Sequence, residues 1–125
     1  MQLILRALAA LAIVALVGCG KSVDAKREDI IKCSGFSMAL ITVPAGSPLL
    51  SSVEASLTKD GITGGDTFSM SNAAQKYASA MDPAKVTRLA QEGASAAAGF
   101  VRNSDANGIA DYLKGCVATY KDLGS

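Results

Sequence analysis

The clearest alternation of apolar and polar positions along the chain lies between residues 83 and 102. Its apolar positions recur every three or four residues: Val86, Leu89, Ala90, Gly93, Ala97, Phe100 and Val101. Its polar positions fall on the opposite side of a helix: Lys85, Arg88, Gln91, Glu92, Ser95 and Arg102. This spacing predicts an amphipathic helix that is capped by Asp82 and begins at Pro83. Its glycine and alanine positions predict close packing against a neighbouring helix.

A second helix is predicted from Ser22 to about Thr42, and its two halves differ. The first half, SVDAKREDIIK, is charged and predicts a solvated face, on which Glu28 and Lys32 are four residues apart in the favourable order. The second half, CSGFSMALITV, is apolar on nearly every side, which predicts burial between other helices. Pro44 would then end this helix.

A third helix is delimited by local signals at both ends. Ser47 is a capping hydroxyl, and Pro48 follows it in the first helical position. Gly61 occupies the expected position just beyond the last turn, so that Ile62 would fold back on Leu57. The apolar face of this helix comprises Leu49, Leu50, Val53 and Leu57.

Two further helices complete the predicted set. The first follows the glycine-rich stretch Asp60–Asp66, DGITGGD, which predicts a flexible connector rather than a partner-binding loop. Its apolar stripe comprises Met70, Ala73, Ala74, Tyr77 and Met81. The second runs from about Asp105 to Lys121, with an apolar face formed by Ala106, Ile109, Ala110, Leu113, Cys116, Val117 and Tyr120. Together these patterns predict a small all-α domain, a four- or five-helix bundle.

The beginning of the chain has a different pattern. A single positive charge at Arg6 precedes an uninterrupted apolar run, residues 7–18, which ends in a small residue before Cys19. This run is shorter than the ~20 residues that a membrane-spanning helix requires. The three-part layout predicts a secretory signal that is cleaved.

The sequence LVGC, which ends at Cys19, resembles the lipobox of bacterial lipoproteins, and the resemblance covers about the first 20 residues. It implies a diacylglycerol on the sulfur of Cys19 and usually a third acyl chain, such as palmitate, on its amine. Two or more chains attach a protein stably to a membrane. Because Gly20 is not the aspartate that retains such proteins at the inner membrane, the resemblance implies the periplasmic face of the outer membrane in a Gram-negative host. It divides the chain into a signal peptide (1–18), a membrane tether (19–23) and a helical domain (24–125).

The same region also fits a second pattern. ALVGCGKS, from Ala15 to Ser22, matches the loose form of a nucleotide-binding phosphate loop. That loop must follow a buried strand and open a helix within a parallel sheet. No later stretch predicts an apolar strand that ends in aspartate, and the chain is short for such a sheet. The sequence therefore favours the cleaved signal.

If Cys19 carries lipid, two cysteines are left, Cys33 and Cys116. In an exported protein two such cysteines predict a disulfide, because the compartment is oxidising. The bridge would join the first helix of the bundle to the last one and close the bundle. Two free buried thiols remain the alternative.

Charge and composition limit the classes of function. The chain carries 12 basic and 11 acidic residues, and loss of Arg6 with the signal would make the two numbers equal. A neutral domain lacks the basic surface that nucleic acid requires. It also lacks a polybasic patch for anionic lipid, so the acyl groups on Cys19 alone would hold it at the membrane. The chain has no histidine, the commonest general base and transition-metal ligand, and neither an enzyme nor a cofactor or metal site is expected.

Two short motifs match catalytic or metal-binding patterns only in part. NSDANGIADYLK, from Asn103, has calcium-loop residues at its first, third, fifth and sixth places, but Lys114 replaces the closing acidic residue. A polar turn with Asn103 or Ser104 as a helix cap explains it better. Ser56 and Lys59 fit the Ser-x-x-Lys pattern of penicillin-binding enzymes without the other motifs of those enzymes.

Two classes of function remain. The first is a membrane-anchored envelope lipoprotein with an interaction or structural role, for example one that binds another envelope protein. The second is a periplasmic binding module, either a chaperone or an inhibitor of a partner protein. A large exposed apolar patch near GFSMALITVPAG would favour the second class, and a uniformly polar surface would favour the first.

Overall fold

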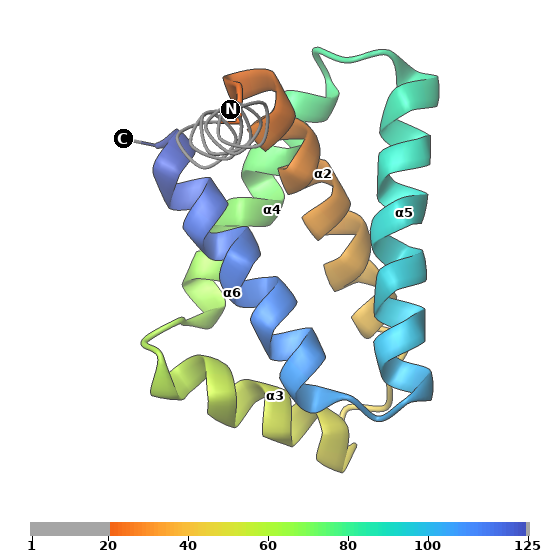
Figure 1. The fold of residues 1–125 in the computed structure, drawn as a ribbon, viewed down its shortest axis with the longest axis vertical. Helices are drawn as coiled ribbons and strands as arrows, with labels where there is room; N and C mark the ends of the chain where they lie inside the picture. Colours follow the sequence, from red (N-terminus) through yellow and green to blue (C-terminus); the bar gives the residue numbers. More distant parts are fainter. Residues whose placement is uncertain (1–20, 125) are drawn as a thin grey trace, which may run out of the picture.

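The computed structural model describes residues 21–124, and helices are the regular structure of this range. Figure 1 shows five of them: α2 (Val23–Leu40), α3 (Pro48–Lys59), α4 (Gly64–Ala78), α5 (Pro83–Arg102) and α6 (Ala106–Leu123). The predicted all-α bundle is therefore confirmed. Within the described range, none of the helices has the length and apolar character needed to cross a bilayer. The predictions for the signal peptide, Cys19 and most of the phosphate loop concern residues 1–20 and lie outside the described residues.

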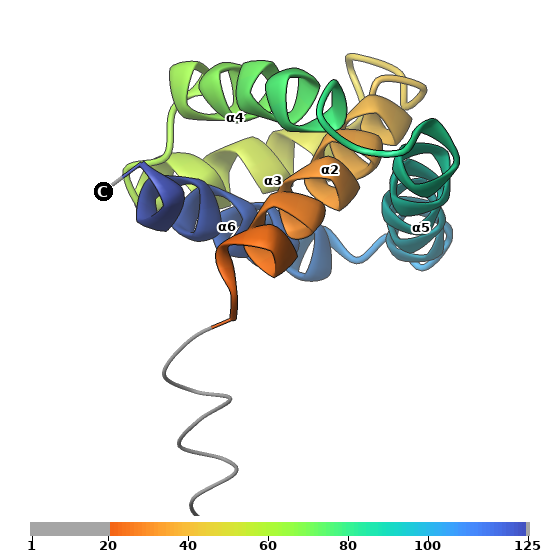
Figure 2. The same cartoon turned by 90° about the horizontal axis from the view of Figure 1, so that it is seen from above.

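Helix α2 lies at the centre of the bundle. It packs most extensively against α5 and also contacts α4 and α6. In the view of Figure 2, these three helices surround α2 on three sides. Helix α3 lies across one end of the bundle and packs against α6.

Two glycines allow α2 and α5 to lie in close contact. A Cβ atom on Gly93 would lie 1.9 Å from the carbonyl oxygen of Lys32, and one on Gly35 would lie 2.2 Å from the carbonyl oxygen of Ala90. Any side chain at either position would push the two helices apart. The close packing predicted for the glycine face of α5 is confirmed, and Gly35 is its counterpart on α2.

Stacked aromatic rings form the centre of one cluster of buried side chains. The ring of Phe36 stacks on that of Tyr112 with ring centres 3.9 Å apart, and it meets Phe100 edge-on at 6.0 Å. Phe36 is fully buried, and Val53 brings α3 into the same cluster. This cluster therefore unites α2, α3, α5 and α6.

The predicted disulfide between Cys33 and Cys116 is confirmed. The two sulfur atoms are 2.12 Å apart and the Cα atoms 5.9 Å apart. The bridge is buried beside Ile30, Met70 and Ala74, where it joins α2 to α6. The two cysteines are 83 positions apart in the sequence. If a disulfide acts by lowering the entropy of the unfolded chain, closing a loop of this length stabilises the fold by about 4 to 5 kcal/mol.

The end of α3 follows the prediction from its sequence. Gly61 has a φ of 76°, in the left-handed region that glycine adopts without strain. The N–H of Ile62 donates to the carbonyl oxygen of Leu57 at 3.0 Å. The chain therefore folds back on α3 as expected.

The flexible connector predicted for residues 60–66 is wrong in its second half, because α4 begins at Gly64. Oγ1 of Thr63 accepts a hydrogen bond from the N–H of Asp66 at 3.3 Å, and the carboxylate of Asp66 accepts one from the N–H of Thr63 at 2.9 Å. The second bond holds the pKa of Asp66 below its usual value. This reciprocal cap offsets the poor helix propensity of Gly64 and Gly65.

The predicted cap of the last helix is also corrected. Asp105, not Asn103 or Ser104, precedes α6, and its carboxylate accepts a hydrogen bond from the N–H of Gly108 at 2.8 Å. Asn103 instead ends α5. Ser104 has a φ of 50°, so the turn between the two helices passes through the left-handed region.

The charged half of α2 is more than a solvated face. Glu28 pairs with Lys85 of α5 at 3.3 Å, and Lys32 pairs with Glu92 of α5 at the same distance. The predicted interaction between Glu28 and Lys32 is therefore replaced by two ion pairs across the helix contact. The close approach at the two glycines brings these side chains within reach of α5.

The apolar half of α2 is buried on one side only. Gly35 and Phe36 face the core, but Met38 and Ile41 are 66% and 79% exposed. The prediction of burial on nearly every side is thus wrong for these two residues, because the other described helices leave one side of this end of α2 uncovered.

Candidate functional site

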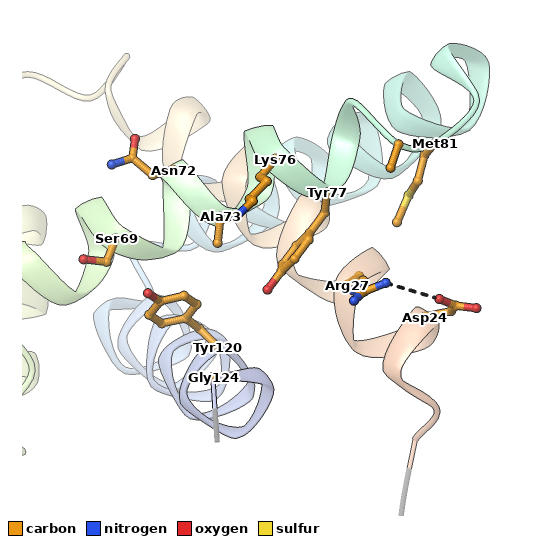
Figure 3. A pocket seen from close by; sticks show the side chains of 11 residues that line it. Asp24, Arg27, Ser69, Asn72, Ala73, Lys76, Tyr77, Met81, Tyr120 and Gly124 are labelled. Atoms are coloured by element: carbon orange, nitrogen blue, oxygen red, sulfur yellow. Dashed lines mark ion pairs between the residues drawn. The ribbon is translucent and has the colours of Figure 1, made fainter.

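A groove of about 800 Å³ lies between α2, α4 and α6. Figure 3 shows the side chains that line it. Helix α2 contributes Asp24 and Arg27 from its first turns, α4 contributes Lys76 and Tyr77 from its last turns, and α6 contributes Tyr120 near its end. The groove therefore lies at the end of the bundle where the described chain begins.

The packing of α4 explains why a hollow forms there. Met70 and Ala74 anchor this helix in the core beside the disulfide. The neighbouring positions on the helix surface, Ala73 and Tyr77, face the groove. Opposite them, Gly124 follows α6 without a side chain. Small residues on two walls thus leave the space between these helices unfilled.

The groove has an excess of positive charge. The guanidinium of Arg27 lies over the ring of Tyr77, 5.4 Å from the ring centre, and 3.8 Å from the carboxylate of Asp24. Figure 3 shows Asp24 on the outer side of Arg27, away from Tyr77 and Tyr120. The ammonium group of Lys76 forms no hydrogen bond or ion pair with another residue of the described range. Two cations therefore share this space with one carboxylate at its edge.

Other cations near the groove are neutralised by carboxylates. Lys26 pairs with Asp122, which ties the first turns of α2 to the end of α6. Lys21 pairs with Asp29 at 2.7 Å. The pair between Lys26 and Asp122 thus joins two walls of the groove, and Arg27 and Lys76 are the cations that line it.

A second hollow, of about 520 Å³, lies between α3 and the start of α4. Apolar and hydroxyl side chains such as Leu57, Ile62 and Thr67 line it, and Glu54 is the charged residue of this lining. Its residues include no cation and no pair of reactive groups. The groove at the start of α2 is therefore the stronger candidate site.

Ser56 lies in a polar cluster, but it is hydrogen-bonded to Lys114 and not to Lys59, the lysine of the Ser-x-x-Lys motif. The Nζ of Lys114 donates to the Oγ of Ser56 at 3.0 Å and pairs with Asp60 at 2.7 Å. The hydrogen bond and the charge of Lys114 hold the pKa of Asp60 below its usual value. The cluster joins α3 to α6, and Lys59 of the Ser-x-x-Lys motif is not part of it.

The residues of the partial calcium-loop motif form the end of α5 and the start of α6, and they do not form a metal-binding loop. Asn103 terminates α5, the carboxylate of Asp105 is engaged as the cap of α6, and the residues from Ala106 onward are helical. Over residues 21–124, no group of three or more potential metal-binding side chains converges.

Among the predicted site residues, Cys33 and Cys116 come together in the disulfide. The predicted lipid site, Cys19, lies outside the described residues and stays a prediction.

The sequence pattern did not identify the groove residues as a site. It assigns Tyr77 and Tyr120 to apolar helix faces and singles out neither Arg27 nor Lys76. The available signal is a tyrosine beside a basic residue at the edge of an apolar stripe, as in Lys76-Tyr77. That signal becomes informative only when α4 is known to face the start of α2.

Comparisons with known proteins give no relative for this chain. No protein-family model, no curated protein and no solved structure matched it.

Proposed function

We propose that the protein is a lipid-anchored lipoprotein of the bacterial cell envelope that acts by binding a ligand or partner in the groove. The observation that carries this proposal is the position of α2, the first helix of the described range. Helix α2 begins at Val23, and the Oγ of Ser22 caps it by accepting the N–H of Ala25 at 3.1 Å. Four residue steps from Cys19 to Val23 span at most about 14 Å. A bundle attached through Cys19 would therefore rest close to the membrane surface.

The place of the groove supports a binding role at that surface. Asp24 and Arg27 lie directly after the tether and also line the groove. A ligand presented at the membrane would reach the groove without any movement of the bundle. In a Gram-negative host, Gly20 after the lipobox cysteine favours the periplasmic face of the outer membrane, as the lipoprotein resemblance implies.

Metabolic labelling tests the anchor. Bacterial cells that produce the full chain and grow with an alkynyl palmitate analogue should incorporate the label into the membrane-bound protein. Cys19→Ser should abolish the labelling, because the sulfur and the new N-terminus of the processed chain are both lost as acceptors. The double variant Cys33→Ser/Cys116→Ser is the control and should keep the label. Wild-type protein without label, or a labelled Cys19→Ser variant, would contradict the proposal.

The exposed end of α2 supports a second candidate, a periplasmic module that binds partner chains. Met38 and Ile41 are one helical turn apart and expose 66% and 79% of their surface. They lie in the stretch GFSMALITVPAG, where a large exposed apolar patch would favour this class. The two side chains would contact apolar segments of an unfolded or partner protein.

Aggregation of a denatured client protein distinguishes this second candidate. The wild-type protein should slow the aggregation, and Met38→Ser/Ile41→Ser should lose this effect. Phe68, on α4, is 68% exposed, so that Phe68→Ser is a control at an unrelated apolar position. Equal effects of the control and the double variant would exclude the end of α2 as the binding surface.

A further inference from the structure

We propose that the groove between α2, α4 and α6 binds the phosphate of an anionic phospholipid headgroup, with Arg27 and Lys76 as its cationic contacts. The choice of a lipid as the source of the phosphate rests on the proposed anchor at Cys19. The anion site itself rests on the groove alone.

The two cations suit a phosphate in complementary ways. The planar guanidinium of Arg27 can donate two parallel hydrogen bonds to phosphate oxygens, and the ammonium group of Lys76 adds a second charge from the opposite helix. The pair between Arg27 and Asp24 is long, at 3.8 Å, and the carboxylate of Asp24 is largely exposed to solvent, so it competes weakly for the guanidinium. Lys76 has no competing partner among the described residues.

The rest of the lining suits the part of a lipid next to its phosphate. Tyr77 and Tyr120 each combine a ring with a hydroxyl group, a combination that favours the membrane–water interface. Ala73 and Met81 add apolar surface beside them. A glycerol backbone and its first methylene groups can contact these side chains while the phosphate meets the two cations.

The distribution of charge favours a small anion over other ligands. The neighbouring cations Lys21 and Lys26 pair with carboxylates, whereas Arg27 and Lys76 line the groove with a single carboxylate, that of Asp24. Such a local site fits one headgroup, whereas nucleic acid requires an extended basic surface. The short distance from Cys19 would also hold the groove near a high concentration of headgroups.

Native mass spectrometry of the processed protein, extracted from the membrane in a mild detergent, tests the site. Short-chain phosphatidylglycerol, short-chain phosphatidylcholine and inorganic phosphate are titrated separately. Phosphatidylglycerol should bind at least about tenfold more tightly than phosphatidylcholine, because the choline cation of phosphatidylcholine is repelled by Arg27 and Lys76 and offsets the attraction of its phosphate. The double variant Arg27→Gln/Lys76→Gln should lose this preference.

A matched variant removes the same charges elsewhere. Lys59 and Arg88 are exposed and lie outside the groove, and Arg88→Gln/Lys59→Gln should keep its affinity for phosphatidylglycerol within about twofold of the wild type. Lys76→Glu provides a second probe, because this exposed side chain supports no contact in the fold. It should weaken the binding of phosphatidylglycerol more than Lys76→Gln does.

The outcomes distinguish a lipid from free phosphate as the ligand, and they distinguish failure of the anion site from failure of the lipid anchor. Equal binding of the two lipids, or equal losses in the two double variants, would overturn the anion site. Inorganic phosphate that binds as tightly as phosphatidylglycerol would support the anion site and overturn a lipid as its source. The same spectra report the acyl mass on Cys19. An unacylated protein that still prefers phosphatidylglycerol would therefore overturn the anchor alone.

Discussion

At Gly93, the absence of one side chain determines how closely α5 approaches α2. A methyl group there would lie 1.9 Å from the carbonyl oxygen of Lys32, which is backbone and cannot rotate away. The ion pairs of Glu28 and Lys32 with α5 depend on the same approach. A change at this single position should therefore disturb packing and electrostatics together.

Gly93→Ala should lower the free energy of unfolding by at least about 2 kcal/mol, because the helices must separate to admit the methyl group. Gly115→Ala is the matched control, since a Cβ atom there meets nothing within 4 Å. The control should raise stability by about 0.5 to 1 kcal/mol through helix propensity. Thermal unfolding of the full chain in detergent measures both, and similar melting temperatures for the two variants would contradict the role of Gly93.

The ion pair of Asp60 with Lys114 should make stability depend on acid. The pKa of Asp60 is lower in the folded protein than its usual value, so the folded state favours the charged carboxylate. This contribution is fully present above the pKa of the unfolded chain, about 3.9. It is lost as the pH falls below that value and through the folded pKa.

Melting temperatures between pH 2 and pH 7 test this dependence. Asp60→Asn should flatten the acid limb of the wild-type curve. Asp111→Asn, at an exposed position without an ion pair in the described range, should leave that limb unchanged. An unaltered acid limb in Asp60→Asn would show that the contact with Lys114 contributes nothing measurable to stability.

At the scale of the helices, a capping side chain fixes the start of each described helix. Ser22, Ser47, Thr63, Asp82 and Asp105 each accept a hydrogen bond from the first turn of the following helix. The groove depends on the cap of α4, because this helix carries Lys76 and Tyr77 and begins with two glycines, which are poor helix formers. The reciprocal cap of Thr63 and Asp66 is therefore expected to contribute to the stability of the helix that forms this wall of the groove.

Thr63→Ala should lower stability by about 1 kcal/mol, the usual cost of losing a capping side chain. Thr87 is exposed in the interior of α5, and Thr87→Ala is the control, expected to be neutral or slightly stabilising. Hydrogen exchange of the amides of α4 would locate the effect. Unchanged exchange at Asp66 and its neighbours in Thr63→Ala would show that the cap is dispensable.

The boundaries and faces of the helices could be predicted where residues close in sequence determine them. They were harder to predict where contacts between distant segments determine them. The proline after Ser47, the glycine at position 61 and the amphipathic pattern of α5 act within a few residues, and the structure confirms them. The start of α4 was missed, because the glycines at 64 and 65 predict a loop unless Asp66 is recognised as half of a cap.

At the scale of the whole molecule, contacts between distant segments create both the bundle and the groove. The disulfide joins residues 83 positions apart, and the pairing of the two cysteines could be predicted by counting. The groove could not, because it requires that the end of α4 face the beginning of α2 and the end of α6. Exposure of Met38 and Ile41 was unpredictable for the same reason, since it depends on which side of α2 the other helices cover.

Reduction of the disulfide should destabilise the whole bundle and not only one helix. Loss of a native bridge that closes a long loop typically costs about 2 to 5 kcal/mol, and this bridge lies in the core between α2 and α6. The melting temperature of the full chain should fall markedly with reductant. Cys33→Ala/Cys116→Ala should show the same low value with and without reductant, and a further fall on reduction would point to another redox-sensitive group.

We propose that a disulfide-closed bundle is held at the membrane through Cys19, and the intact mass of membrane-extracted protein is the decisive measurement. The mass should match a chain that starts at Cys19 and is heavier by two or three acyl chains, and it should rise by the mass of two hydrogen atoms on reduction. An unmodified chain that retains Met1 and keeps the same mass with reductant would contradict both the anchor and the closed bundle.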